Sequence, residues 1–368
     1  MSWIMSLVRP ELSGIKPYVP GKPIDEVKRE LGLETVVKLA SNENPYKVPD
    51  AVLEAAKRAL SEMHRYPDAA SYHLVRAIAK KLGVSPDEVI VGNGSEYIID
   101  TLMKVFVSPG DEVVYAVPSF VVYRIAASVM GAKRVEVPCK DYRHDLEAMA
   151  EAITDKTKLV FVCNPNNPTG TIVRRDELDQ FFASVEGKRL LVVMDEAYFE
   201  YAKDPNYPDG LQYFRRYGNV VVLRTFSKIY GLAGLRIGYG IAPKEIVSIY
   251  NTIREVFAVN VVAQAAALAA LKEDAYVSWV SMKVYEEKKK LYEALSKMGL
   301  PYVESEANFV LIKVRDSKLA FEEMLKRGVV VRPTDSFDLP NHIRVTVGTP
   351  EENEVFLKAL KELLPLLR

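Results

Sequence analysis

Short runs of Val, Ile and Leu alternate with helical apolar periods between about Pro45 and Glu255, and this alternation is the strongest constraint on the fold. It is typical of βα units, which build a mostly parallel sheet. Several runs are apolar at consecutive positions, as expected for strands that helices cover on both faces. The expected strands are Glu88–Val91, Glu112–Ala116, Arg134–Val137, Leu159–Cys163, Leu190–Met194, Val220–Leu223 and Ile237–Ile241.

The order of elements changes after about residue 256. Long charged helices come first, then strand candidates at Phe309–Val314, Val329–Val331 and Ile343–Val347. The last helix has a clear start, because Thr349 precedes Pro350 and Glu352 as in a capping box. This change in the order of helices and strands predicts a second, smaller domain. We therefore expect an α/β protein with an arm over residues 1–45, a large domain over 46–255 and a small C-terminal domain over 256–368.

Charge and composition narrow the possible functions. The chain has 49 basic and 49 acidic side chains, interspersed along its length, so we expect no nucleic-acid or anionic-membrane partner and favour a small-molecule enzyme. Cys139 and Cys163 belong to no Cys/His cluster, which predicts neither a disulfide framework nor a metal site. The longest apolar stretch, Val261–Leu271, is too short to span a bilayer and predicts a buried helix. Because the N-terminus lacks the pattern of a signal peptide, we expect a cytoplasmic protein.

Three polar side chains, Asn167, Asp195 and Lys228, follow expected strands. Ligands bind beyond the carboxyl ends of strands in open α/β sheets, so these residues are predicted to meet in one crevice. A desolvated lysine amine is nucleophilic and can form a Schiff base with an aldehyde, and an acid can pair with a ring nitrogen. Pyridoxal 5′-phosphate is the cofactor that needs both groups. Taken alone, each residue has a simpler interpretation: a turn, a helix N-cap and a surface charge.

A phosphate site is expected near Gly94, Ser95 and Glu96, which open a helix after a strand. Free backbone N–H groups at such a position bind anions. Arg236 can add a fixed positive charge, and the hydroxyl groups of Ser95 and Ser227 can donate hydrogen bonds. A lone Gly-x-Gly is more often only a turn.

With these motifs the chain resembles the fold-type-I pyridoxal-phosphate aminotransferases along nearly its whole length. Within that family it is similar to the histidinol-phosphate enzymes, and the resemblance implies a small domain completed by the N-terminal arm. The family motifs are Gly92–Glu96, Pro165–Gly170, Asp195–Tyr198, Ser227–Lys228 with Gly231 and Arg236, and Arg344–Thr349. The features shared with the histidinol-phosphate enzymes are Lys16–Tyr18, Leu39–Pro45, Arg65–Pro67, Val330–Pro333 and Ile343–Arg344.

The resemblance assigns further roles around the cofactor. Lys228 would hold the cofactor as an aldimine and then move the proton at the substrate Cα. Tyr198 and Asn167 would hydrogen-bond the ring oxygen, while Asp195 would pair with the ring nitrogen. Phe120 stands where the family often stacks a tyrosine, so stacking is retained and a hydroxyl group is absent.

The resemblance also implies how the substrate is held. Arg344 matches the arginine that binds the substrate carboxylate, and Arg332 matches a second anion-binding arginine. Tyr18 and Tyr66 are similar to tyrosines that complete the site. Tyr66 would come from a second subunit and would also contact the cofactor. This implies a homodimer with shared active sites. Arg332 as a surface ion pair and Tyr18 as a packing residue are equally open alternatives.

The implied reaction is amino transfer between L-histidinol phosphate and 2-oxoglutarate, giving imidazole acetol phosphate and glutamate, a step of histidine biosynthesis with ping-pong order. Two alternatives use the same scaffold: an aromatic amino-acid aminotransferase and a threonine-phosphate decarboxylase. A third is a regulator or interaction protein that binds the cofactor without turnover. The absence of a basic stripe from the sequence argues against the third.

Overall fold

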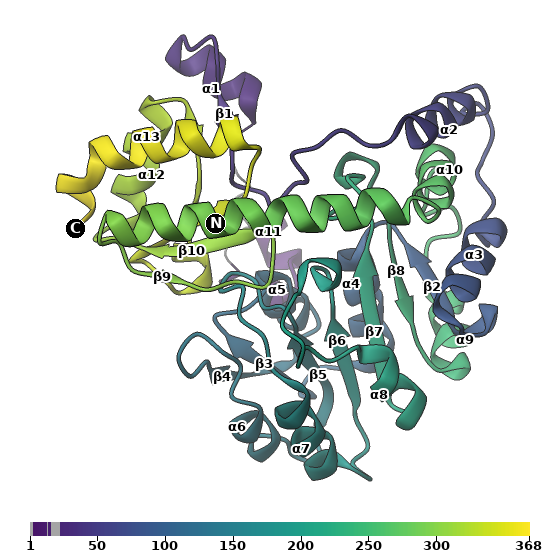
Figure 1. Ribbon diagram of the computed structural model, residues 1–368. Helices are drawn as coiled ribbons and strands as arrows, with labels where there is room; N and C mark the ends of the chain where they lie inside the picture. Colours follow the sequence, from purple (N-terminus) through teal and green to yellow (C-terminus); the bar gives the residue numbers. More distant parts are fainter. Residues whose placement is uncertain (1–2, 13, 16–22) are drawn as a thin grey trace.

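The fold is built on a seven-stranded sheet, here called the large sheet (Figure 1). The computed structural model describes residues 3–12, 14–15 and 23–368. The strand order is β2-β8-β7-β6-β5-β3-β4, and only β8 runs antiparallel to its neighbours. The strands are β2 Val89–Gly92, β3 Glu112–Val117, β4 Lys133–Pro138, β5 Thr157–Cys163, β6 Leu191–Asp195, β7 Val220–Thr225 and β8 Gly238–Ile241.

Helices cover both faces of the large sheet, as the consecutive apolar positions predict. Leu159 and Phe161 of β5 pack in one apolar cluster with α4, α5 and α9, whereas Val160 and Val162 pack in another with α7, α10 and α11. The helices around this sheet are α2 Asp50–Leu60, α3 Tyr72–Leu82, α4 Ser95–Phe106, α5 Val121–Val129, α6 Leu146–Glu151, α7 Arg175–Val185, α8 Gly210–Arg216, α9 Lys244–Ile253 and α10 Val261–Ala270.

A four-stranded antiparallel sheet, here called the small sheet, lies at the other end of the molecule (Figure 1). The long helix α11 (Asp274–Lys297) runs between the two sheets. The small sheet has the order β12-β13-β10-β9, and a separate parallel pair joins β1 to β11. The elements are β1 Val37–Lys38, β9 Tyr302–Val303, β10 Phe309–Lys313, β11 Val329–Val330, β12 Arg332–Pro333, β13 His342–Thr346, α1 Ile24–Leu31, α12 Ser317–Lys326 and α13 Pro350–Leu367.

Short 3₁₀ helices connect these elements. They are η1 Trp3–Leu7, η2 Pro10–Leu12, η3 Pro86–Glu88, η4 Phe199–Tyr201, η5 Ala233–Leu235 and η6 Asp335–Phe337.

The α/β class and the mostly parallel sheet are confirmed, and all seven expected strands of the large sheet are present. The capping box before α13 is also present, because the Thr349 side chain accepts from the Glu352 amide and the Glu352 carboxylate accepts from the Thr349 amide. Helix α2 ends at Leu60, although the helical apolar spacing of the sequence continues to Met63, which is 75% exposed.

The boundary between the expected domains stays a prediction. Helix α10, which follows residue 255, packs against α2 and α3 beside the large sheet. After α10 the chain passes to the small sheet through α11.

Candidate active site

A cavity of about 400 Å³ opens at the carboxyl ends of β5, β6 and β7. The start of α4 and one side of α5 form a second wall, and Phe337 and Arg344 close it from the small-sheet side. The large sheet thus places its cavity where open α/β sheets bind ligands. Its lining includes Ser41, Asn42, Ser95, Glu96, Asp100, Phe120, Cys163, Asn167, Asp195, Tyr198, Thr225, Ser227, Lys228, Arg236, Phe337 and Arg344.

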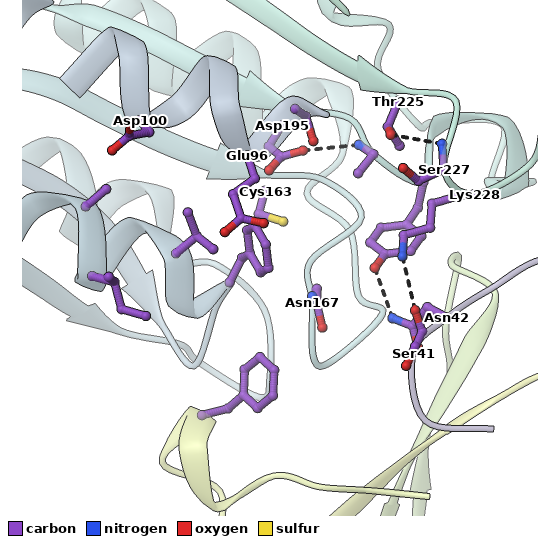
Figure 2. Close-up of a pocket in the computed structure, with 18 of the residues that line it drawn as sticks. Ser41, Asn42, Glu96, Asp100, Cys163, Asn167, Asp195, Thr225, Ser227 and Lys228 are labelled. Carbon is purple, nitrogen blue, oxygen red and sulfur yellow. Dashed lines mark hydrogen bonds between the residues drawn. The ribbon is translucent and has the colours of Figure 1, made fainter. Parts of the chain in front are cut away.

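Asp195 and Lys228 enter this cavity from neighbouring strands (Figure 2). Asp195 is the last residue of β6, and Lys228 lies three residues after the end of β7, which pairs with β6 in parallel. The Lys228 Nζ donates a hydrogen bond to the Ser41 carbonyl oxygen at 3.2 Å. Burial lowers the pKa of Lys228 to about 8, and repulsion from Arg344 acts in the same direction. A substantial fraction of this amine is therefore neutral near pH 8.

The Asp195 carboxylate is held from behind by two donors. Its Oδ2 accepts a hydrogen bond from the Tyr123 hydroxyl at 2.6 Å, and its Oδ1 accepts from the Ala197 amide at 3.2 Å. Burial raises the pKa of Asp195, while the hydrogen bonds from Tyr123 and Ala197 and the charge of Lys228 oppose this rise. Asp195 is 2% exposed and lines the same cavity as Lys228.

A second pair of contacts orders the opposite side of the cavity. The Tyr198 hydroxyl accepts a hydrogen bond from Asn42 Nδ2 at 2.9 Å (Figure 2). Arg344 of β13 donates to the Asn167 side-chain oxygen and, at 2.8 Å, to the Ala40 carbonyl oxygen. These bonds join the loop after β5 and the segment after β1 to the small sheet.

The start of α4 is built for close approach. Gly94 has a φ of 87°, and a Cβ there would lie 3.0 Å from the Arg236 guanidinium. A Cβ on Gly238 of β8 would lie 2.5 Å from the Ser95 backbone nitrogen, so glycine is required for β8 to contact this turn. The free N–H groups of α4, the Ser95 and Ser227 hydroxyls and Arg236 thus lie at one end of the cavity. This donor set suits a phosphate group.

Most of the predicted site residues meet in this cavity. Ser95, Glu96, Phe120, Asn167, Asp195, Tyr198, Ser227, Lys228, Arg236 and Arg344 line it, and Gly94 lies against Arg236.

Two predicted residues lie outside this cavity, and the position of a third is not described. Arg332 pairs with Arg344 in the register of β12 and β13, but its guanidinium donates to Ser336 Oγ at 3.3 Å and does not line the cavity. Tyr66 is 81% exposed and stacks on Phe257. Tyr18 falls outside the described residues.

The sequence reasoning missed three contributors: Tyr123, Asn42 and Phe337. Tyr123 lies three residues after Phe120, a spacing that puts two side chains on one helical face. Asn42 belongs to a motif used only for the resemblance, and its φ of 54° is a conformation that asparagine tolerates. Phe337 carries no local sequence signal that we recognise.

Two further structural findings concern partners. Within residues 3–12, 14–15 and 23–368, no group of three His, Cys, Asp or Glu side chains is placed to hold a metal ion. Among the same residues, no helix has the length and apolar character needed to cross a membrane.

The fold and cavity define an α/β protein in which a lysine amine, a buried carboxylate and a helix start suited to an anion line one cavity. The sequence profile of the family Aminotransferase class I and II matches residues 34–360. The chain belongs to this family of aminotransferases.

Its similar relatives include the Histidinol-phosphate aminotransferase of Moorella thermoacetica, which is 50% identical over 97% of this chain and 92% of its own length. Histidinol-phosphate aminotransferase 2 of Carboxydothermus hydrogenoformans is 48% identical over 98% of this chain and all of its own. Among solved structures, the histidinol-phosphate aminotransferase from Sinorhizobium meliloti in complex with pyridoxal-5′-phosphate has a TM-score of 0.87 at 26% identity, covering 98% of both chains.

Proposed function

We propose that this chain transfers the amino group between L-histidinol phosphate and 2-oxoglutarate, giving imidazole acetol phosphate and L-glutamate in histidine biosynthesis. Support comes from relatives that are 47 to 50% identical over 95 to 98% of the chain and carry the name histidinol-phosphate aminotransferase. The observation that carries the mechanism is the shared cavity of Lys228 and Asp195.

The proposed cofactor is pyridoxal 5′-phosphate, which supplies an electron sink for the carbanion formed at the substrate Cα. The residues present fit this group. The α4 N-terminus, Ser95, Ser227 and Arg236 would hold its phosphate, because the turn at Gly94 leaves backbone N–H groups free and a fixed charge beside them. Asp195 would hold the ring nitrogen in its protonated form, and Phe120 would cover the ring.

Lys228 is the proposed acid and base. With a pKa of about 8, its Nζ can accept a proton from the substrate Cα in its neutral form and donate one in its charged form. Its hydrogen bond to the Ser41 carbonyl fixes the direction of the amine. The proposed order is ping-pong: the first product would leave before the second substrate binds, and the same amine would serve both half-reactions.

Tyr198 and Asn167 are proposed to orient the ring oxygen. Asn42 holds the Tyr198 hydroxyl, and Arg344 holds the Asn167 amide oxygen, so both side chains are fixed before any ligand arrives. Arg344 is also the proposed partner of the substrate carboxylate in the 2-oxoglutarate half-reaction. Arg332 and Tyr18 remain proposed contacts of the phosphorylated substrate.

The proposed working unit is a homodimer with shared active sites. Tyr66 and Phe257 are 81% and 44% exposed, and their rings stack with centroids 4.4 Å apart. Exposed aromatic side chains that lie together are typical of interface cores. In this proposal Tyr66 completes the site of the partner. We also propose a cytoplasmic location and the division at residues 45 and 255.

The test is the absorption spectrum of the cofactor-loaded protein. Adding histidinol phosphate should bleach the cofactor band, and adding 2-oxoglutarate should restore it. The ratio kcat/KM should be highest for histidinol phosphate when phenylalanine and threonine phosphate are compared as donors. An unchanged spectrum with histidinol phosphate, or a preference for phenylalanine, would contradict the proposal.

A further inference from the structure

Tyr123 is a buried tyrosine that contacts Asp195 without lining the cavity. It lies on α5, is fully buried, and donates its hydroxyl proton to Asp195 Oδ2 at 2.6 Å. A charge-assisted hydrogen bond of this length is among the strong ones in proteins. None of the roles assigned above uses this residue.

The phenol is held rigidly in place. The Tyr123 ring stacks on Phe161 of β5 with centroids 4.5 Å apart and an interplanar angle of 19°. It meets Phe120 edge-on, with centroids 5.7 Å apart. One side chain therefore fixes the Asp195 carboxylate and also supports the aromatic residue proposed to cover the cofactor ring.

We propose that Tyr123 is a positioning residue: it fixes one oxygen of Asp195, turns the carboxylate toward the cavity and keeps it ionised for the cofactor ring nitrogen. This inference rests on the proposed function, because it needs the cofactor in this cavity. It goes beyond that function because it assigns to Tyr123, outside the cavity lining, the task of keeping the Asp195 carboxyl ionised.

The surroundings of Asp195 explain why a donor is needed there. Burial disfavours its charged form and raises its pKa, whereas the Tyr123 hydrogen bond acts in the opposite direction. The other titratable groups that act on it or respond to it are Lys228, Cys163 and Tyr198. Burial raises the pKa of both Cys163 and Tyr198, so these two stay neutral at physiological pH and Lys228 supplies the nearby positive charge.

The chain offers a matched control in Tyr115. This tyrosine belongs to the same apolar cluster, is 2% exposed, and donates its hydroxyl to a carboxylate, Glu136 Oε1, at 2.7 Å. Its ring centroid lies 6.2 Å from that of Tyr123. Tyr115→Phe therefore removes the same kind of bond from the same core without touching Asp195.

The experiment compares Y123F with Y115F in three measurements: the dissociation constant of pyridoxal 5′-phosphate, the pH midpoint of the bound cofactor's absorbance change, and the melting temperature of the cofactor-free protein. Y123F should weaken cofactor binding about tenfold, as expected for a lost hydrogen bond to a charged group. It should also move the midpoint to higher pH: the midpoint reports the protonation of the lysine nitrogen bound to the cofactor, and a ring that carries less positive charge repels that proton less. Y115F should stay within about twofold in binding and keep the midpoint.

A double-mutant cycle with D195N tests whether Tyr123 acts through Asp195. In the D195N background, Y123F should change cofactor binding less than twofold. Full additivity of the two substitutions, or wild-type binding and midpoint in Y123F, would overturn the inference.

The outcomes also separate this inference from the proposed function. If the wild-type protein binds the cofactor but does not react with histidinol phosphate, only the proposed substrate is contradicted. If the wild-type protein does not bind the cofactor, both the proposed function and the role of Tyr123 are contradicted.

Discussion

Two lysines, the half-buried Lys228 and the buried Lys288, have the same lowered pKa of about 8 and very different surroundings. Lys228 follows β7 and borders the cavity, where its Nζ donates to the Ser41 carbonyl. Lys288 lies on α11, is 3% exposed, and donates to the backbone carbonyls of Ser305 and Ala307. A lowered pKa alone therefore does not distinguish a reactive amine from a structural one.

The difference lies in what each amine faces. Lys288 donates to two carbonyl groups of one loop, so its hydrogen bonds serve the Ser305–Asn308 segment. That segment contacts loops that line the site, because the Glu306 backbone amide donates to the Gly170 carbonyl and the Asn308 side chain donates to the Asn42 carbonyl. Lys228 borders a cavity that the Asp195 carboxylate also lines. We infer that one lysine performs chemistry and the other fixes the loops around it.

The largest expected effect comes from replacing each lysine in turn. K228A should lower kcat by roughly 10⁴-fold, because the proton-transferring amine is lost. K288M should retain kcat within about tenfold, since it removes no group from the cavity. Stopped-flow absorbance with histidinol phosphate measures both. Equal losses in the two variants would remove the distinction drawn between them.

Much of the Lys228 region was predictable from sequence, and the Lys288 region was not. Asn167, Asp195 and Lys228 follow apolar runs, so their common edge of the sheet can be inferred locally. The Tyr123–Asp195 and Asn42–Tyr198 contacts join segments 72 and 156 residues apart, which no local pattern encodes.

Strand direction and buried charge were also beyond the sequence reasoning. The connection from β7 to β8 contains only the short 3₁₀ helix η5, and β8 returns antiparallel to β7, a direction that the sequence analysis did not assign. Lys288 opens a run of three lysines that looks solvent-exposed. Only its spacing from Val284 and Leu291, both buried, indicated an inward side chain.

Gly170 connects the two regions and gives the next effect. Its φ is 76°, and a Cβ would lie 2.1 Å from Ser305 Oγ, so G170A should lower the free energy of unfolding by about 3 kcal/mol through strain and overpacking. It should also lower kcat, because the Asn167 loop must move. Urea unfolding and steady-state kinetics measure these effects.

Gly187 provides the control for Gly170. It has nearly the same φ, 75°, and nothing within 4 Å of its added Cβ. G187A should therefore lower the free energy of unfolding only through the strain of a positive φ, by about 1 kcal/mol, and should leave kcat unchanged. A cost for G170A no larger than that for G187A would show that contact with Ser305 is unimportant.

The pH dependence of stability separates Lys288 from its exposed neighbour Lys289. Below pH 8 Lys288 is protonated in both the folded and unfolded states, so the buried charge lowers the free energy of unfolding by its full amount. Between pH 8 and about 10.5 the unfolded state binds more protons, so the free energy of unfolding of the wild type should rise relative to K288M, by up to roughly 3 kcal/mol. K289M should follow the wild type across this range, and a pH-independent difference between wild type and K288M would contradict the lowered pKa.

The smallest expected effect concerns Arg332, which lies in register with Arg344 but outside the cavity lining. If it binds the phosphate of the donor substrate, R332A should raise the KM for histidinol phosphate about tenfold and change the KM for phenylalanine less than twofold. R327A is the control, since Arg327 is bound to Glu323 and Glu362 at the surface. Equal losses for both substrates would give Arg332 a structural role beside Ser336. The boundary between reacting and supporting residues would then run between Arg344 and Arg332, as it does between Lys228 and Lys288.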